Sequence, residues 1–178
     1  MKIFIVHYKK LTERKDYLLS TLKGYDVEFV DEFDRDDFNM GNIIYDENLW
    51  RDRINSIKTE RYNPTFEKLK NSEICNSLSH IKCYEKIVQE NLDYALILED
   101  DVILTDDFYF QLEKIISKVS DFDFIFLGNS YTMSLLDDIH NSKSIKIFDR
   151  LYYKDPGHTR TVDSYLISKE CAKNNRRT

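Results

Sequence analysis

Residues 94–101, with the sequence YALILEDD, join an uninterrupted apolar run to three consecutive acids. A short apolar run of this kind is typical of a strand that is buried on both faces, as the central strands of parallel sheets are. In open α/β sheets, ligands bind at the carboxyl ends of the strands, where the loops diverge. The stretch therefore predicts a central strand that brings Glu99, Asp100 and Asp101 to a binding edge.

The opening of the chain predicts the neighbours of this strand. Residues 2–6, KIFIV, form a short run of β-branched and aromatic residues that favours a buried strand. Thr12 is a candidate cap for a helix that runs to about residue 23, before Gly24, and residues 27–30 predict a second strand. Because strand, helix and strand in succession favour parallel pairing, we expect an α/β fold with a mixed, mostly parallel sheet flanked by helices.

Periodicity elsewhere predicts further elements of the same fold. A helical stripe covers residues 72–90, and a second amphipathic helix is expected to begin at Asp106 or Asp107. Further strands are expected at 124–127, 145–148 and 162–168. Between residues 31 and 71 the pattern weakens, which indicates a long, partly helical excursion.

Composition limits the class of protein. The 178 residues fit a single domain spanning 1–178, and 42% are hydrophobic, which is enough for a core. The net charge of −6 argues against a nucleic-acid partner, since such proteins usually present a basic face. No apolar run approaches the roughly 20 residues of a membrane span. The three cysteines include no CxxC pair, so no disulfide framework is expected and a reducing, cytoplasmic location is favoured.

The acidic cluster has two interpretations on its spacing alone. Adjacent carboxylates repel one another, and they are best tolerated where water solvates them or a cation neutralises them. Hard oxygen ligands suit Mg²⁺ or Mn²⁺, which proteins usually hold with one or two carboxylates together with substrate phosphates. A solvated exit from the strand explains the same acids equally well.

The sequence on either side of the three acids favours the metal-binding interpretation. Residues 73–102, EICNSLSHIKCYEKIVQENLDYALILEDDV, resemble glycosyltransferase family 25, whose pattern is roughly E-I-G-C-x-L-S-H-x-x-x-W, a short spacer and then A-L-I-L-E-D-D. Cys75 and Asn76 stand where that pattern has Gly-Cys, and Tyr84 stands where it has Trp. Looser similarity extends to IFIVHYKKLTERKDYL near the start, to DFDFIFLGN and to VDSYLIS.

The resemblance implies a GT-A-type nucleotide-binding domain and a sugar-transfer reaction. Glu99 and Asp101 match the outer positions of a DxD-like motif and would hold Mn²⁺ or Mg²⁺, while Asp100 between them would contact the substrate. The donor would be a nucleoside-diphosphate sugar, with a UDP-sugar the usual one. The hexose would pass with inversion to a hydroxyl group of a glycan or protein acceptor.

Several other residues are candidates for the site. Arg14, Asp31, Glu32, Ser79, His80 and Asn129 are predicted to contact the donor, each with a plain structural alternative such as an exposed arginine, a solvated loop or a core histidine. Asp163 and His158 are the candidates for the general base that takes the acceptor proton.

Two other functions remain open. The family pattern continues past the segment similar to VDSYLIS, so we expect the domain to be incomplete at its C-terminal end. A non-catalytic or degenerate sugar-nucleotide-binding module is therefore the alternative. A metal-dependent phosphohydrolase is disfavoured, because the first strand leads into His7 and Tyr8 and not into a nucleophilic aspartate.

Overall fold

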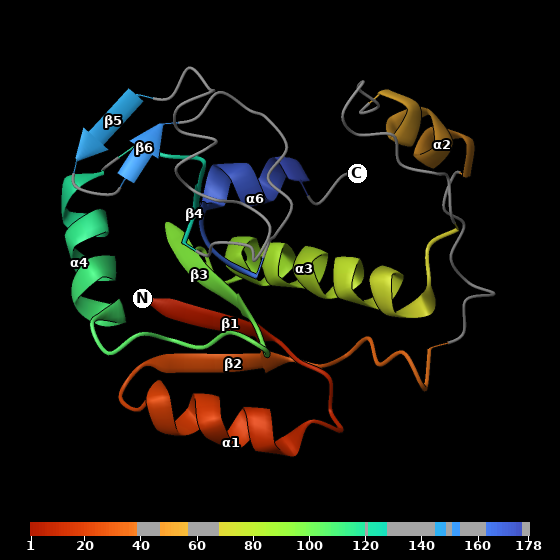
Figure 1. Ribbon diagram of the computed structural model, residues 1–178, viewed down its shortest axis with the longest axis horizontal. Coiled ribbons are helices and arrows are strands. Elements are labelled where there is room, and N and C mark those ends of the chain that lie inside the picture. Colours follow the sequence, from red (N-terminus) through yellow and green to blue (C-terminus); the bar gives the residue numbers. More distant parts are fainter. Residues whose placement is uncertain are drawn as a thin grey trace.

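A five-stranded mixed sheet forms the centre of the computed structural model (Figure 1). The structure describes residues 1–38, 47–56, 68–119, 121–127, 145–148, 151–153 and 163–175. The sheet has the order β2-β1-β3-β7-β4, in which β1 pairs in parallel with β2 and β3, and β7 pairs antiparallel with β3 and β4. Its strands are β1 (Lys2–Val6), β2 (Asp26–Val30), β3 (Tyr94–Glu99), β4 (Phe124–Phe126) and β7 (Ser164–Ser168).

Helices cover both faces of this sheet. One face carries α1 (Thr12–Thr21) and α4 (Phe108–Lys118), and the other carries α3 (Asn71–Gln89) with α6 (Lys169–Asn175) beside it. The remaining elements are α2 (Glu47–Ser56) and a separate two-stranded sheet of β5 (Ile145–Phe148) and β6 (Leu151–Tyr153). The predicted α/β class, with a mixed sheet between helical layers, is confirmed.

Strand β3 is buried on both faces, as its apolar sequence predicts. Ala95 and Ile97 pack in the cluster beneath α3, whereas Leu96 and Leu98 pack in the cluster beneath α1 and α4. All four side chains are 0% exposed. Hydrogen-bonded neighbours lie along both edges, so β3 is the central strand of the sheet.

Local interactions at its two ends determine where the long helix α3 begins and ends. The backbone N–H of Lys70 donates to Glu73 Oε2 at 2.7 Å, an interaction that caps the amino end of the helix. At the other end Asn91 has φ of 55°, the left-handed conformation that asparagine tolerates just after a helix. The predicted helix over 72–90 is therefore present with its bounds displaced by one residue.

The first helix differs from the prediction in its capping. Leu11 is the N-cap residue, without a capping hydrogen bond from its side chain, and Thr12 is already the first helical residue. Thr12 was therefore wrongly predicted as the cap. The helix also ends at Thr21, and Gly24, with φ of 95°, lies in the turn that leads into β2.

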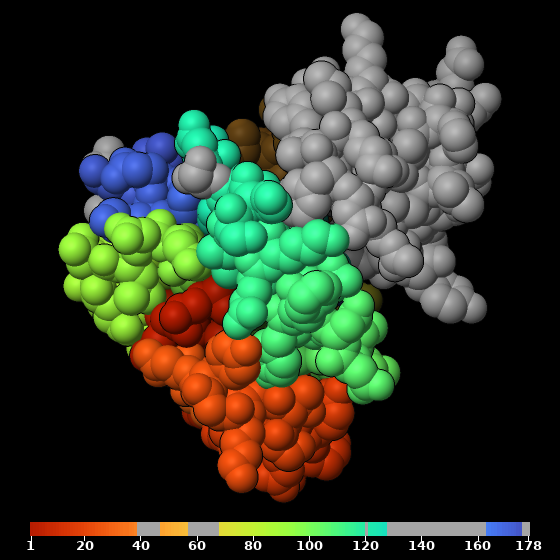
Figure 2. All heavy atoms as spheres, turned by 90° about the vertical axis from the view of Figure 1, so that its left-hand side faces the viewer, coloured from red at the N-terminus to blue at the C-terminus, as the bar shows by residue number. Residues whose placement is uncertain are grey.

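Figure 2 views the molecule from the side where β1 begins, with α1 and β2 at the bottom of this face and α4 across its middle. The carboxyl ends of the parallel strands point away from this side, toward the first turn of α3 (Figure 1). Within the described part of the chain, no helix combines the length and the apolar character needed to cross a membrane.

We expect Ile97→Ala to lower the free energy of unfolding by about 2–5 kcal/mol, because it opens a cavity in a site that cannot collapse easily. Ile103→Ala is the matched control, since Ile103 is 87% exposed just beyond the same strand. The control should change stability by less than about 0.5 kcal/mol. Urea unfolding of both variants measures the difference, and equal losses would contradict the central position of β3.

Candidate functional site

The parallel strands β1, β2 and β3 end together at one edge of the sheet. Val6 at the end of β1 lies opposite Val30 of β2 and Glu99 of β3. The chain leaves β1 through His7, whose backbone N–H donates to the Val30 carbonyl at 3.1 Å. The residues after β1 and the acids after β3 therefore share this edge.

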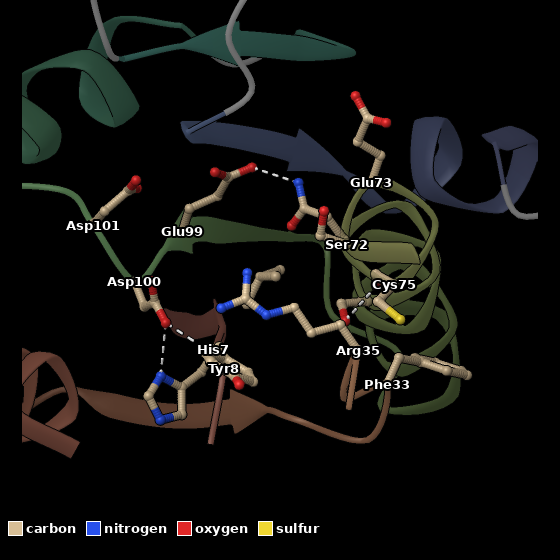
Figure 3. A pocket seen from close by; sticks show the side chains of 13 residues that line it. His7, Tyr8, Phe33, Arg35, Ser72, Glu73, Cys75, Glu99, Asp100 and Asp101 are labelled. Carbon is tan, nitrogen blue, oxygen red and sulfur yellow. Dashed lines mark hydrogen bonds and ion pairs between the residues drawn. The ribbon is translucent and has the colours of Figure 1, made fainter. Parts of the chain in front are cut away.

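A pocket with a volume of about 280 Å³ opens at this edge (Figure 3). Its walls come from the end of β1, the loop after β2, the first two turns of α3 and the acidic end of β3. The lining residues are Val6, His7, Tyr8, Phe33, Arg35, Ser72, Glu73, Cys75, Asn76, Ser79, Glu99, Asp100 and Asp101.

Glu99 is held by helix α3. Asn76 Nδ2 donates to Glu99 Oε1 at 3.0 Å, and His80 Nε2 lies 3.2 Å from the same oxygen. The hydrogen bond with His80 is the main reason that the pKa of Glu99 is lowered, and it outweighs the opposing effect of burial. Glu99 is thus held as a carboxylate, and no described residue is recorded in contact with its second oxygen, Oε2.

A buried polar chain lies behind Glu99. His80 Nδ1 is 2.7 Å from the hydroxyl of Tyr165 on β7, and this hydroxyl is 3.0 Å from that of Tyr84. Tyr165 is 0% exposed and His80 6% exposed. Burial raises the pKa of both tyrosines, which keeps the two phenols protonated. Both ring nitrogens of His80 are therefore in use, and His80 lies outside the pocket wall.

Asp100 turns toward the end of β1 (Figure 3). Its Oδ2 lies 2.9 Å from His7 Nδ1 and accepts from the Tyr8 backbone N–H at 3.0 Å, and its Oδ1 accepts from Arg14 at 2.7 Å. Its side chain is only 11% exposed. Asp100 thus joins the ends of β3 and β1, and both of its oxygens already have protein partners.

Asp101 is the exposed member of the acidic cluster. No other residue in the described part of the chain forms a hydrogen bond or ion pair with its carboxylate, and Figure 3 shows this carboxylate on the side of the strand away from Asp100. Partial desolvation, and then the charge of Glu99, raise the pKa of Asp101. Glu99 and Asp101 are therefore two like charges with oxygens still open to a ligand.

This pair fits a cation that is shared with a substrate. Among the residues that the structure describes, no group of three or more His, Cys, Asp or Glu side chains is arranged to hold a metal ion. Two carboxylates with open oxygens are nevertheless enough for Mg²⁺ or Mn²⁺ when phosphate oxygens and water complete the coordination.

The structure separates the other candidates by position. Arg14 lies at the site but is bound to Asp100, and Ser79 lines the pocket while its hydroxyl donates to the Cys75 carbonyl at 2.9 Å. Glu32 pairs with Lys82 at 3.0 Å and with Lys86 at 3.6 Å on α3. Neither Glu32 nor its neighbour Asp31 lines the pocket.

The structure describes one of the two candidate general bases, Asp163. The backbone carbonyl of Asp163 accepts from the Glu99 backbone N–H at 2.7 Å, so Asp163 flanks the acidic end of β3. Its side chain is not part of the described pocket wall. His158 and Asn129 lie outside the described residues, and their roles stay predictions.

Sequence reasoning did not assign four residues that build this site. His7 carried a usable signal, because it directly follows a strand that is parallel to β3. Asn76 stands one turn before His80 on α3, which also indicates a shared helix face. Tyr165 and Arg35 carried no such signal. Tyr165 meets His80 only through the tertiary fold, and Arg35 reaches the pocket from an irregular loop.

Comparison with known proteins identifies the family of the chain. The profile of glycosyltransferase family 25 (LPS biosynthesis protein) matches residues 1–174. Procollagen galactosyltransferase 2 of Mus musculus is 25% identical over 133 residues, which cover 71% of this chain and 20% of that protein. The chain belongs to glycosyltransferase family 25, as the resemblance of residues 73–102 indicated. Its matched part spans about a fifth of the length of that relative.

The adjacent aspartates should respond oppositely to the same substitution. Asp100→Asn should lower the free energy of unfolding at neutral pH by about 1–3 kcal/mol, because it weakens hydrogen bonds to three donors in a mostly buried position. Asp101→Asn should raise stability slightly, by less than about 1 kcal/mol because the group is exposed.

The sign for Asp101 follows from its raised pKa. Ionisation in the folded protein lags behind ionisation in the unfolded chain as the pH rises, so the ionised group destabilises the fold at neutral pH. Urea unfolding in a chelating buffer measures both variants, and the effect of Asp101→Asn should vanish near about pH 3, where both states are protonated. A loss of stability in Asp101→Asn at neutral pH would show that Asp101 has a stabilising partner.

Proposed function

We propose that this chain binds a UDP-sugar together with Mn²⁺ or Mg²⁺ in the pocket and transfers the hexose, with inversion, to an acceptor hydroxyl. The observation that carries the proposal is the separation of the three acids. Both carboxylate oxygens of Asp100 are hydrogen-bonded to other residues of the protein, whereas Glu99 and Asp101 keep oxygens open beside the pocket. Membership of family 25 supports sugar transfer as the reaction.

Each residue near the acids has a role in this proposal. Glu99 and Asp101 hold the ion, while Asn76 and His80 fix the orientation of Glu99 from α3. The ion, when bound, neutralises charge on the departing diphosphate. The acceptor oxygen forms a bond to the anomeric carbon as the bond to the diphosphate breaks, and a general base takes the hydroxyl proton. Asp163 is the candidate for that base within the described residues.

The comparisons suggest the substrates. The relative is named as a galactosyltransferase, which favours galactose among the hexoses. The family description refers to LPS biosynthesis and the relative's name to procollagen, so a glycan and a protein hydroxyl are both acceptors to test.

A sugar-nucleotide-binding module without transfer is the second candidate. It is favoured by one observation, that the described pocket wall offers no candidate base once Glu99 and Asp101 are assigned to the ion: His7 is bound to Asp100, and Asp163 lies outside the wall. Release of UDP from UDP-galactose, measured with and without acceptor glycans and procollagen peptides, separates the two functions. Release stimulated by acceptor identifies a transferase, and binding without release identifies a module.

We expect Mn²⁺ and UDP-galactose together to raise the melting temperature more than either alone. Binding to the folded state stabilises it by RT ln(1 + [L]/Kd), about 2.7 kcal/mol at a hundredfold excess over Kd. Asp101→Asn should abolish the Mn²⁺-dependent part of this shift, because it removes one of the two open carboxylates.

Asp106→Asn is the control for loss of an acid, since Asp106 is exposed in the loop that follows and does not line the pocket. It should retain the full shift. An Asp101→Asn variant that responds to Mn²⁺ and donor like the parent would remove Asp101 from the proposed metal site.

A further inference from the structure

Most of the charged side chains that line the pocket proposed to receive the donor are acidic. Four carboxylates contribute to its wall, those of Glu73, Glu99, Asp100 and Asp101. A nucleoside diphosphate is itself an anion, so its approach to this wall is opposed unless cations offset the charge. A metal ion held by Glu99 and Asp101, as proposed above, would supply part of that offset.

The cationic side chains around the site are mostly committed to protein carboxylates. Arg14 is bound to Asp100 at 2.7 Å, and Lys10 is paired with Asp36. On the α3 side, Lys82 is paired with Glu32 and Lys86 with Glu28. The positive charge of each of these side chains is already offset by a protein carboxylate, so each attracts a phosphate less strongly than an unpaired cation would.

Arg35 differs from them in position and in partners. It is the only lysine or arginine among the described residues that line the pocket, and none of those residues forms an ion pair with it. Its guanidinium carbon lies 4.0 Å from the centroid of the Tyr8 ring, a cation–π contact. Figure 3 shows the side chain extending across the pocket from the α3 side toward the acidic end of β3.

Hydrogen bonds hold in place the Tyr8 ring on which Arg35 lies. The Tyr8 hydroxyl donates to Asp36 Oδ2 at 2.6 Å, and the Asp36 backbone N–H donates to the Oδ1 of buried Asp34 at 2.9 Å. These bonds tie the loop after β2 to the loop after β1. A guanidinium held against a ring keeps its N–H edge for two oxygens of an anion such as a phosphate group, and holding it in place reduces the entropy lost on binding.

We propose that Arg35 binds the diphosphate of the donor, opposite the cation held by Glu99 and Asp101. The inference rests on the proposed function and extends it, because it assigns the phosphate subsite to the loop after β2. The guanidinium donates charge-assisted hydrogen bonds to phosphate oxygens, and these are among the stronger hydrogen bonds that proteins form. Bound diphosphate would thus lie between two cationic groups and be shielded from the acidic wall.

Calorimetric titration of the full chain with UDP in the presence of Mn²⁺ tests this assignment. Arg35→Gln should weaken UDP binding by about tenfold to a hundredfold, which is the range expected for losing hydrogen bonds to a charged group. Arg35→Lys keeps the charge but not the planar fork, so it should show a smaller loss. Lys9→Gln removes the same charge from an exposed position outside the pocket and should change UDP affinity by less than about twofold.

The outcomes separate the inference from the proposed function. Equal UDP affinity in the parent, Arg35→Gln and Arg35→Lys would overturn the role of Arg35 and leave the proposed function standing. An equal loss in Lys9→Gln would also overturn it, by showing a general effect of charge. A parent that does not bind UDP in the presence of Mn²⁺ would overturn the proposed function as well. Melting temperatures of the free variants close to that of the parent would show that the losses are not caused by unfolding.

Discussion

The burial of β3 on both faces and along both edges is the constraint on which the site depends. A strand enclosed by β1, β7 and two helical layers has no solvated side along its length, so charged residues can follow it only where it leaves the sheet. The apolar run forces Tyr94–Glu99 into the centre of the sheet, and the same placement brings the acids to the edge where β1 and β2 also end. The segment Tyr94–Glu99 therefore determines both the packing of the core and the position of the site.

Three adjacent acids do different work because β3 ends at Glu99 and the chain turns at Asp100 and Asp101, so that their side chains point in different directions (Figure 3). Asp100 points back to the end of β1, where it meets His7, Tyr8 and Arg14, and stabilises the junction of the two strands. Glu99 and Asp101 face the other way and repel each other. Partial desolvation, and then repulsion by Glu99, raise the pKa of Asp101, and a protein selected only for stability would remove this cost. Unrelieved charge at a strand end is thus consistent with a ligand that relieves it.

Sequence reasoning reached the parts of the fold that local pattern controls. The run before Glu99 predicted the central strand, and the stripe over residues 72–90 predicted α3 nearly to the residue. The role of Glu32 was harder to predict. Its position after β2 suggested that it contacts the donor, whereas in the structure it pairs with Lys82 and Lys86 on a helix about fifty residues later in the sequence. Such a pairing depends on how α3 lies across the sheet, which periodicity does not determine.

The same limit applies to Tyr165 and Arg35. The segment SYLIS predicts a strand, but nothing in it shows that the tyrosine hydroxyl meets His80. The loop after β2 has no periodicity at all, so only its attachment to Tyr8 shows that Arg35 lies at the pocket. In both cases the contact joins segments that are distant in the chain.

The insertion of β7 between β3 and β4 has a consequence for how the protein is made. During synthesis the chain emerges at about 5–20 residues per second, and β3 leaves the ribosome well before residues 163–168. Until those residues arrive, one edge of the most apolar strand is unpaired, and such an edge is a template for aggregation. Glu99 at that time also lacks its backbone partner at Asp163, and His80 lacks the Tyr165 hydroxyl. A nascent chain should therefore need chaperone protection of β3 during this interval, and its acidic site should mature only when the late strand closes the sheet.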